Sequence, residues 1–169
     1  MQDNPTTRVM IAIPCLNDVP TKFMMSLIAL QQYKIGGVDI NVVVVEDSMT
    51  YTARTQLASM ALQDQYDFIL WIDSDMVFHR DMLYRMLMAG NETVTGLYFQ
   101  RRGNHKPVIY KRCEVLTDHS EDDRLAITEV YEDYPTEGLF KVAACGFGAV
   151  LMHTEAIRRV ARENNGCVF

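Results

Sequence analysis

Two patterns of apolar residues alternate along the first part of the chain. Short, mostly β-branched apolar runs predict strands at residues 8–14, 40–45 and 68–72. Apolar residues at helical spacing predict a helix after each of these strands, the first ending at Gly36-Gly37 and the third running from about 81 to 89. The apolar stripes of the three helices are Phe23, Leu27 and Leu30; Leu57, Ala58 and Ala61; and Leu83, Met86 and Leu87.

This alternation predicts an α/β fold with a mostly parallel central sheet and helices on both faces. The run INVVVV predicts that both faces of the second strand are covered, and Ser48 and Thr50 are plausible caps for the helix that follows it. Ligands of such sheets bind beyond the carboxyl ends of the strands. The polar turns at 14–17, 46–48 and 73–75 should therefore meet at one rim of the sheet.

The pattern weakens after a fourth strand, which is predicted at 93–99. Residues 100–138 are polar, contain the acidic tract HSEDDR, and offer strand-like pieces at 108–110 and 126–131. We interpret them as a hairpin-bearing insertion rather than a second domain, because they hold too few apolar residues for a core of their own.

The last part of the chain returns to regular structure. Strand character reappears at 139–144 and 149–152, and Thr154 is predicted to cap a final helix. The residues of that helix expected to face inward are Ile157, Val160 and Ala161. We expect residues 1–169 to form a single domain.

Composition and charge narrow the possible partners. The 16 basic and 22 acidic residues give a net charge of -6, which argues against nucleic acid or an anionic membrane as the main partner. The apolar runs are too short to span a bilayer, and MQDNPTTR lacks the apolar core of a signal peptide, so we expect no transmembrane segment and a cytoplasmic protein. The four cysteines form no C-x-x-C pair, so neither a zinc site nor a disulfide framework is indicated.

Two aspartates follow the third predicted strand. Asp73 and Asp75 project to the same side if the strand stays extended there, with Ser74 on the other. Two carboxylates on one side repel unless a cation lies between them, and Mg²⁺ or Mn²⁺ takes oxygen ligands of this kind. The alternative is a solvated loop in which both acids face water, because D-x-D alone is a weak motif.

Arg54 starts on the inward stripe of the second helix. An unpaired guanidinium is costly in such a place, so the side chain needs an anionic partner. Asp47, Asp73 and the diphosphate of a ligand all satisfy this requirement.

The ordered series RVMIAIPCLN, VVVVEDS, YTAR, FILWIDSDM, VTGLYFQRR and ACGFGAVLM resembles nucleotide-sugar-dependent glycosyltransferases of the GT-A type. It is most similar to the family-two-like enzymes that phages and large viruses also encode, so a viral chain would act in the host cytoplasm. The resemblance implies a Rossmann-like nucleotide half at about 8–99, the insertion at about 100–138, and acceptor-side strands and a helix at about 139–165. It implies Mn²⁺- or Mg²⁺-dependent transfer of a sugar, of the hexosyltransferase type, from a nucleoside diphosphate donor, with uridine as the expected base. The acceptor would be a hydroxyl of a carbohydrate or another molecule.

The resemblance also implies which residues surround the nucleoside. The segment around Pro14 and Asn17 would border it, and Glu46 or Asp47 would meet the base or ribose. Arg54 would contact the nucleotide, although asparagine is usual in the family at the position of the next residue, a threonine here.

The same resemblance places the diphosphate and the sugar. Asp73 would face the ribose or the metal shell, Asp75 would bind the metal directly, and Ser74 belongs to the substrate-binding set. In the turn CGFG, Gly146 and Gly148 would let the backbone approach the donor sugar; equally, they would only make a tight turn.

Other polar residues have plainer interpretations. The basic residues after the fourth strand are solvated side chains or add charge near the diphosphate, and the two histidines of the core region are ordinary hydrogen-bonded ones. These residues are Arg101, Arg102 and Lys106, and His79 and His153.

The family pattern is incomplete at its end. Inverting family members supply a catalytic carboxylate from a later Glu-Asp segment at a helix start, and neither Glu155, Glu163 nor the acidic insertion matches it. We therefore assign no general base, and a non-catalytic or truncated nucleotide-sugar-binding domain is the alternative.

A sugar-phosphate nucleotidyltransferase would carry a glycine-rich basic signature after the first strand, where this chain has PCLN. A receiver-type domain would carry an acid pair there.

Overall fold

The computed structural model describes residues 6–46, 48–101, 103–116 and 125–164. Backbone contacts divide the chain into two compact units, Met1–Gly96 with Phe147–Phe169, and Leu97–Gly146. The second unit contains the predicted insertion and extends beyond it at both ends. That the two units together form one domain stays a prediction. No helix in the described ranges is both long and apolar enough to cross a membrane.

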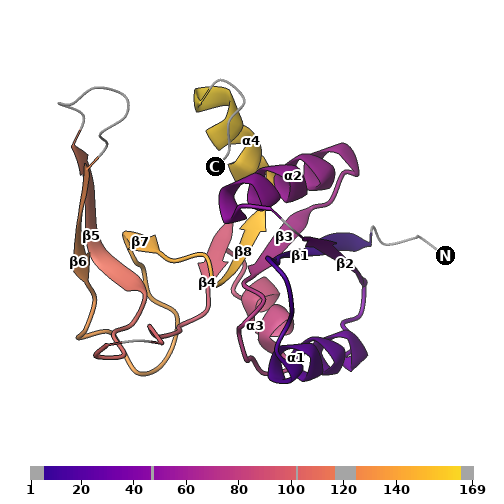
Figure 1. Ribbon diagram of the computed structural model, residues 1–169, viewed down its shortest axis with the longest axis horizontal. Helices are drawn as coiled ribbons and strands as arrows, with labels where there is room; N and C mark the ends of the chain where they lie inside the picture. Colours follow the sequence, from indigo (N-terminus) through magenta and orange to yellow (C-terminus); the bar gives the residue numbers. More distant parts are fainter. Residues whose placement is uncertain (1–5, 47, 102, 117–124, 165–169) are drawn as a thin grey trace. The chain divides into compact units, whose positions relative to one another are not determined.

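The first unit is built on a five-stranded sheet with the order β2-β1-β3-β8-β4 (Figure 1). β1 (Thr7–Pro14) pairs in parallel with β2 (Val38–Val45) on one side and with β3 (Phe68–Ile72) on the other. β8 (Ala149–His153) runs antiparallel between β3 and β4 (Thr93–Thr95). All strands except β8 therefore run in one direction, which confirms the prediction of a mixed α/β fold with a mostly parallel sheet.

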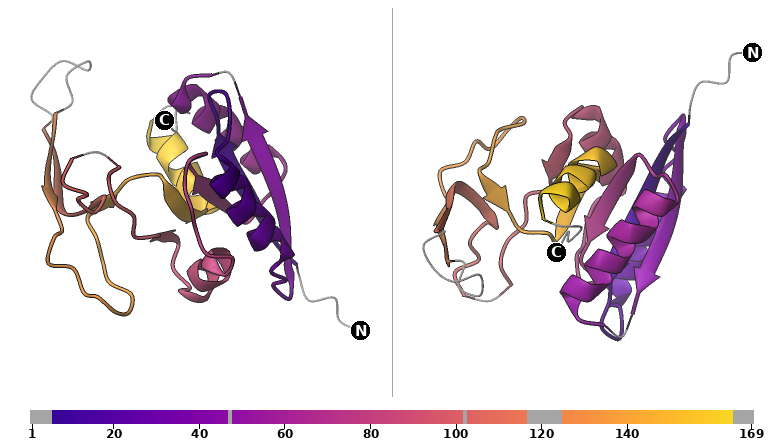
Figure 2. Two further views of the ribbon diagram at one scale, coloured as in Figure 1. Left: turned by 60° about the horizontal axis from the view of Figure 1, so that its bottom comes forward. Right: turned by 90° about the horizontal axis from the view of Figure 1, so that it is seen from above.

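Within the described ranges four helices cover this sheet, and their bounds are α1 Thr21–Gln32, α2 Thr50–Gln63, α3 Met82–Met88 and α4 Thr154–Glu163. Helix α2 packs on β1 and β2 and contacts α4, while α1 and α3 lie on the opposite face (Figures 1 and 2). Alternate residues of β1 serve the two faces: Val9 and Ile11 join the apolar cluster under α1 and α3, whereas Met10 and Ala12 point the other way and are equally buried. The helix after each strand was thus predicted correctly.

The second strand is less covered than its sequence predicts. β2 lies at the edge of the sheet, its residues are mostly half-buried, and Val44 is 44% exposed. A continuous run of β-branched residues is typical of a central strand, but it carries no information on the order of strands. The prediction that both faces are covered holds only in part: Val38, Ile40 and Val42 pack against the apolar cluster under α1, and α2 contacts β2, but the strand remains half-buried.

The predicted helix caps also differ from the observed ones. Met49 is the N-cap of α2 and makes no side-chain cap bond, so neither Ser48 nor Thr50 caps this helix. His153 caps α4, because its side chain accepts from the backbone N–H of Glu155. The hydroxyl of Thr154 is buried and donates instead to the carbonyl oxygen of Tyr66 at 2.9 Å.

The end of the fourth strand and one inward position of the last helix also differ from the prediction. β4 ends at Thr95 rather than at 99, because the chain leaves the sheet where the second unit begins. In α4, Ile157 is buried as predicted, whereas Val160 is 37% exposed and faces outward.

The second unit is a three-stranded antiparallel sheet with the order β6-β5-β7. Its strands are β5 Ile109–Leu116, β6 Leu125–Val130 and β7 Ala144–Cys145. The predicted hairpin is confirmed by the pairing of β5 with β6, and the acidic tract at 119–124 lies outside the described residues. The strand predicted at 139–144 was wrong except for its last residue.

Candidate functional site

The carboxyl ends of three parallel strands lie side by side at one rim of the sheet. Pro14, the last residue of β1, is paired in register with Val45, the last of β2, and β3 flanks β1 on its other side. The backbone N–H of Cys15 continues the ladder by donating to the carbonyl oxygen of Val45 at 2.9 Å. Pro14 is buried and Glu46 is exposed. The parallel pairing thus brings the predicted turns to one rim.

The chain turns as soon as β3 ends. The backbone N–H of Asp73 donates to the carbonyl oxygen of Gly148 at 3.0 Å, and the N–H of Met76 donates to the carbonyl oxygen of Asp73 at 3.1 Å. The extended conformation that would put Asp73 and Asp75 on one side of a strand therefore stops at Ile72. Asp73 and Ser74 are half-buried, and Asp75 is exposed.

An ion pair joins α2 to this turn. Nη2 of Arg54 donates to Oδ1 of Asp73 at 2.9 Å, and the side chains are 18% and 39% exposed. The guanidinium also lies over the ring of Phe147, 5.2 Å from its centroid, and that ring meets Trp71 edge-on at 6.1 Å. Of the three partners predicted for Arg54, the structure shows Asp73.

The electrostatics of Asp73 leave room for a further positive charge. Burial raises the pKa of Asp73 above its ordinary value of 3.8, the charge and hydrogen bond of Arg54 oppose this rise, and the charge of Asp75 adds to it. One guanidinium thus fails to compensate fully for the desolvation of this carboxylate. A second cation next to the two carboxylates would stabilise their ionised forms.

Two buried polar atoms on the α2 side also lack partners. Oγ of Ser48 and Nε of Arg54 are buried and have no hydrogen-bond partner among the described residues. A buried donor without a partner typically costs about 1–3 kcal/mol. Such atoms are expected where a ligand completes the hydrogen bonding of a site.

The carboxylates of Asp73 and Asp75 are the candidate ligands for a divalent ion. No group of three or more His, Cys, Asp or Glu side chains within the described ranges is placed to hold a metal. Mg²⁺ and Mn²⁺, however, are commonly held by one or two carboxylates together with substrate phosphates and water. Asp73 and Asp75 are carboxylates of this kind, so the residue types fit such an ion, and burial together with the charge of Asp75 raises the pKa of Asp73 although Arg54 opposes the rise.

The remaining predicted residues are placed as follows. Asn17 is exposed, and its carbonyl oxygen accepts from Sγ of Cys15 at 3.5 Å. Asp47 lies outside the described residues. Gly146 belongs to the second unit, whereas the paired Arg54 and Asp73 belong to the first. The rim therefore gathers Pro14, Glu46, Arg54 and the Asp73 turn.

The histidines and basic residues are engaged in local contacts. Nδ1 of His79 lies 2.5 Å from Oδ1 of Asp81, and Nδ1 of His153 accepts from Glu155, so both are hydrogen-bonded as predicted. Lys106 forms an ion pair with Glu132 at 2.7 Å within the second unit. Arg102 lies outside the described residues.

Gly146 has a packing reason of its own. A Cβ at this position would lie 2.1 Å from Oη of Tyr98 and 2.6 Å from Cγ1 of Val108. The backbone N–H of Gly146 also donates to the carbonyl oxygen of Val108 at 3.0 Å, so the backbone and the tyrosine ring approach closely here. The second unit needs a glycine at this place for its own packing.

We expect Gly146→Ala to destabilise the second unit by about 1–3 kcal/mol, because the added methyl group overpacks a filled space. The measurement is hydrogen exchange at the amides of Gly146 and Ala143, which bond to Val108 and Tyr110. Gly36→Ala is the matched control, since its Cβ would meet nothing within 4 Å. Equal protection in the variant and the wild type would contradict the packing argument.

Sequence reasoning missed two residues of this site. The ring of Phe147 covers the guanidinium of Arg54, and Ser48 contributes a buried hydroxyl rather than a helix cap. For Phe147 a signal existed, because it is an aromatic residue between two glycines in a turn before a strand. For Ser48 the sequence pattern predicted a helix cap and gave no sign of a buried hydroxyl.

Comparison with known proteins shows which solved structures have a fold similar to that of this chain. No protein-family model matches the sequence, and no curated protein matches it either. Nine chains among solved structures do match. A197 from STIV has a TM-score of 0.59 and 19% identity, with 91% of this chain and 70% of that chain covered. The 4-diphosphocytidyl-2C-methyl-D-erythritol synthase from Anaerococcus prevotii DSM 20548 has a TM-score of 0.52 and 10% identity, with 98% and 78% covered.

These likenesses define the class of fold to which the chain belongs. It is an α/β fold found in a synthase whose product carries a diphosphocytidyl group, and at 10% and 19% identity the likeness extends to the fold alone.

Proposed function

We propose that this chain is a metal-dependent glycosyltransferase that moves a sugar from a nucleoside diphosphate-sugar, with UDP as the expected carrier, to an acceptor hydroxyl. The observation that carries the proposal is the half-buried Asp73, whose pKa stays raised despite its ion pair with Arg54. A site with this excess of negative charge, at the rim where α/β sheets bind nucleotides, is suited to a divalent cation and a diphosphate.

The comparisons support the nucleotide part of this proposal. One similar fold belongs to a protein named for making a diphosphocytidyl compound. The ordered motifs of the sequence, from RVMIAIPCLN to ACGFGAVLM, resemble a family that uses nucleoside diphosphate donors. Both lines support a ligand that contains a nucleotide.

The residues of the rim would have different roles in binding the donor. Asp73 and Asp75 would hold a Mn²⁺ or Mg²⁺ ion, which would supply positive charge to the leaving diphosphate. Arg54 would direct its Nε–H, and Ser48 its hydroxyl, to acceptor atoms of the nucleotide, since neither atom has a hydrogen-bond partner in the part of the chain that the structure describes. Phe147 would keep the guanidinium in place by its cation–π contact.

The reaction itself exchanges one bond for another. The bond between the anomeric carbon and the diphosphate oxygen breaks, the electron pair leaves with the diphosphate, and the acceptor oxygen forms the new bond. The acceptor proton passes to a base, which we leave unassigned. The alternative function is a non-catalytic or truncated nucleotide-sugar-binding domain of the same fold, which would hold the donor without this exchange.

Nucleotidyl transfer is a second candidate, favoured by the likeness to the synthase over 98% of this chain. Such an enzyme would join a nucleoside triphosphate to a sugar phosphate or a related alcohol phosphate and release pyrophosphate. The turn after β1 reads PCLN and lacks the glycine-rich basic signature expected of that chemistry. We therefore rank it second.

Binding of UDP, GDP, CDP and ADP, each with and without Mn²⁺, tests the proposal. We expect UDP with Mn²⁺ to stabilise the chain by about 2.7 kcal/mol at a ligand concentration of 100 Kd, and UDP alone to stabilise it far less. Thermal unfolding and calorimetric titration give the affinities. Hydrolysis of UDP-glucose, followed by release of UDP, then tests turnover.

Each outcome separates one interpretation from the others. Metal-dependent binding with turnover supports the transferase, and metal-dependent binding without turnover supports the non-catalytic form. Pyrophosphate release from CTP in the presence of an alcohol phosphate would favour nucleotidyl transfer. Failure of every nucleotide to bind, with or without Mn²⁺, would contradict the proposal.

A further inference from the structure

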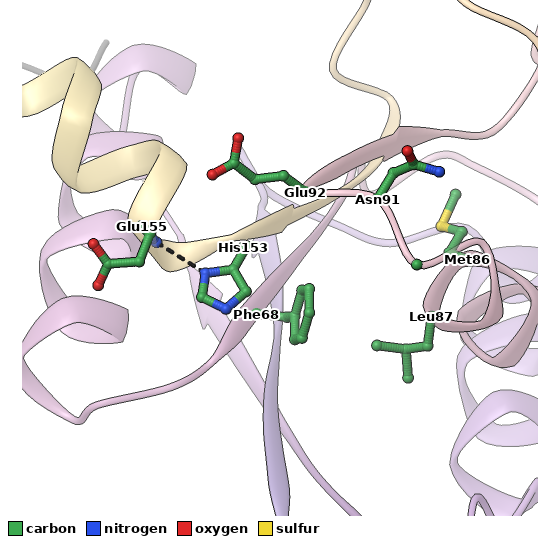
Figure 3. A pocket seen from close by; sticks show the side chains of 8 residues that line it. Phe68, Met86, Leu87, Asn91, Glu92, His153 and Glu155 are labelled. Atoms are coloured by element: carbon green, nitrogen blue, oxygen red, sulfur yellow. Dashed lines mark hydrogen bonds between the residues drawn. The ribbon is translucent and has the colours of Figure 1, made fainter.

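A cavity of about 400 Å³ lies at the end of β3 opposite to the Asp73 turn (Figure 3). It is lined by Phe68, the first residue of β3, by His153, the last residue of β8, and by residues of α3 and of the turn at 90–92. Five residue steps of about 3.3 Å each put about 16 Å of strand between Phe68 and Asp73. The cavity is therefore separate from the rim.

The walls of this cavity are mainly apolar. Phe68, Met86 and Leu87 provide one aromatic and two flexible aliphatic surfaces. The ring of His153 meets that of Phe68 edge-on, with the centroids 4.8 Å apart and an interplanar angle of 76°, and Figure 3 shows His153 between Glu155 and Phe68. Asn91, Glu92, His153 and Glu155 add four polar side chains to this lining. A space of about 300–1,000 Å³ that combines apolar walls with a small number of polar groups is typical of small-molecule sites.

The hydrogen bond that caps α4 fixes the tautomer of His153. Its Nδ1 accepts from the backbone N–H of Glu155 at 3.1 Å. A ring nitrogen that accepts carries no proton, so the neutral imidazole carries its proton on Nε2. Within the described part of the chain Nε2 has no hydrogen-bond partner. The ring therefore presents one hydrogen-bond donor among apolar walls.

The charged groups at the mouth of the cavity neutralise one another. The carboxylate of Glu92 accepts two hydrogen bonds from Arg159, at 2.7 and 2.5 Å, and Glu155 is paired with Arg158. An ammonium ligand would meet carboxylates whose charge the two arginines already offset. An anionic ligand would meet two carboxylates. The mouth thus favours an uncharged occupant.

We propose that this cavity binds a small, uncharged aromatic or heteroaromatic molecule that carries a hydrogen-bond acceptor. The acceptor receives the Nε2–H of His153, and the ring packs against Phe68, Met86 and Leu87. The site is independent of the transferase proposal, because none of its residues belongs to the rim.

Three probes that share one ring but differ in charge test the proposal, namely benzamide, benzylamine and benzoate. We expect benzamide to give saturable shifts of the ring signals of Phe68 and His153 in NMR spectra of the labelled full chain at pH 8. Benzylamine, as an ammonium ion, has no acceptor for the Nε2–H and should bind about two- to tenfold more weakly. Benzoate has an acceptor but meets the carboxylates of Glu92 and Glu155, so it should also bind more weakly than benzamide. Tighter binding of either charged probe, or no saturable shift with benzamide, would overturn the proposal.

Two variants and a control locate the binding. His153→Ser keeps a side-chain oxygen that can cap α4 but removes the Nε2–H, so benzamide should bind at least about fivefold more weakly. Leu87→Phe keeps His153 and fills part of the space, and it should also weaken binding. His79→Ser, which changes an exposed histidine outside the cavity, should leave binding unchanged. Wild-type affinity in both cavity variants would overturn the assignment.

Discussion

Asp75→Ala should abolish the metal-dependent part of UDP binding while leaving the fold intact. Asp75 is exposed and, in our proposal, binds the metal directly. Replacement of a group that only supports a metal ligand already costs about 10–100-fold in metal affinity, so loss of a direct ligand should cost at least about 100-fold. The measurement is calorimetric titration of UDP at fixed Mn²⁺, with thermal unfolding as the check on the fold.

The choice of Asp75 avoids an ambiguity that Asp73 would bring. Asp73 is paired with Arg54, so its loss would disturb the packing of α2 as well as the metal. Asp64→Ala is the matched control, because it removes the same charge from an exposed position at the C-terminal cap of α2. UDP binding that is strong without metal and unchanged in the Asp75 variant would refute the assignment of the metal site.

The local structure of the first unit follows closely from its sequence. β3 begins and ends at the predicted residues, and α2 presents Leu57, Ala58 and Ala61 to the core as its apolar spacing predicts. In both cases the residues that are apolar in the sequence are the ones that the element buries against the core. Local periodicity therefore suffices where an element packs on the core along its whole length.

The order of the strands could not be derived in the same way. β8 lies antiparallel between β3 and β4, although β4 comes long before it in the chain. β2 reads as a central strand but lies at the edge. Strand order is decided by long-range packing, and a run of valines has the same composition at the edge as in the centre.

The candidate site was predictable in part. An arginine on an inward helical stripe needs an anion, and this argument alone led to Asp73 as one of its partners. The contact with Phe147 required two segments far apart in sequence to meet, and no local pattern carries that information. The prediction that Asp73 and Asp75 project to the same side assumed an extended strand there, but the chain turns directly after Ile72.

Arg54→Met should destabilise the first unit by about 1–2 kcal/mol at neutral pH. Breaking a buried ion pair typically costs about 3–5 kcal/mol, and the 39% exposure of Asp73 reduces this figure because water screens the remaining charge. Methionine keeps an unbranched apolar stem, so the change removes the guanidinium together with its charge, its hydrogen bond to Asp73 and its contact with Phe147. Urea unfolding at pH 7 measures the difference in the free energy of unfolding.

The pH dependence of the same variant gives the sharper test. Burial already raises the pKa of Asp73, and removal of Arg54 should raise it further. The folded state then binds a proton more tightly than the unfolded state, so stability falls as pH rises from 3.8 through the raised pKa. The destabilisation by Arg54→Met should therefore be largest at neutral pH and shrink toward pH 4.

A carboxylate whose pKa is shifted in the opposite direction provides a control that distinguishes this effect from a general sensitivity to acid. Hydrogen bonds from His79 and Arg85 lower the pKa of Asp81, so its contribution is present above 3.8 and is lost as pH falls through the lowered pKa. Arg85→Met, at an exposed ion pair, should have a small effect that stays constant above pH 3.8 and disappears only below it, whereas the effect of Arg54→Met changes above pH 3.8. In the double variant Arg54→Met/Asp73→Asn the pH dependence should disappear, and its persistence there would show that Asp73 is not the titrating group.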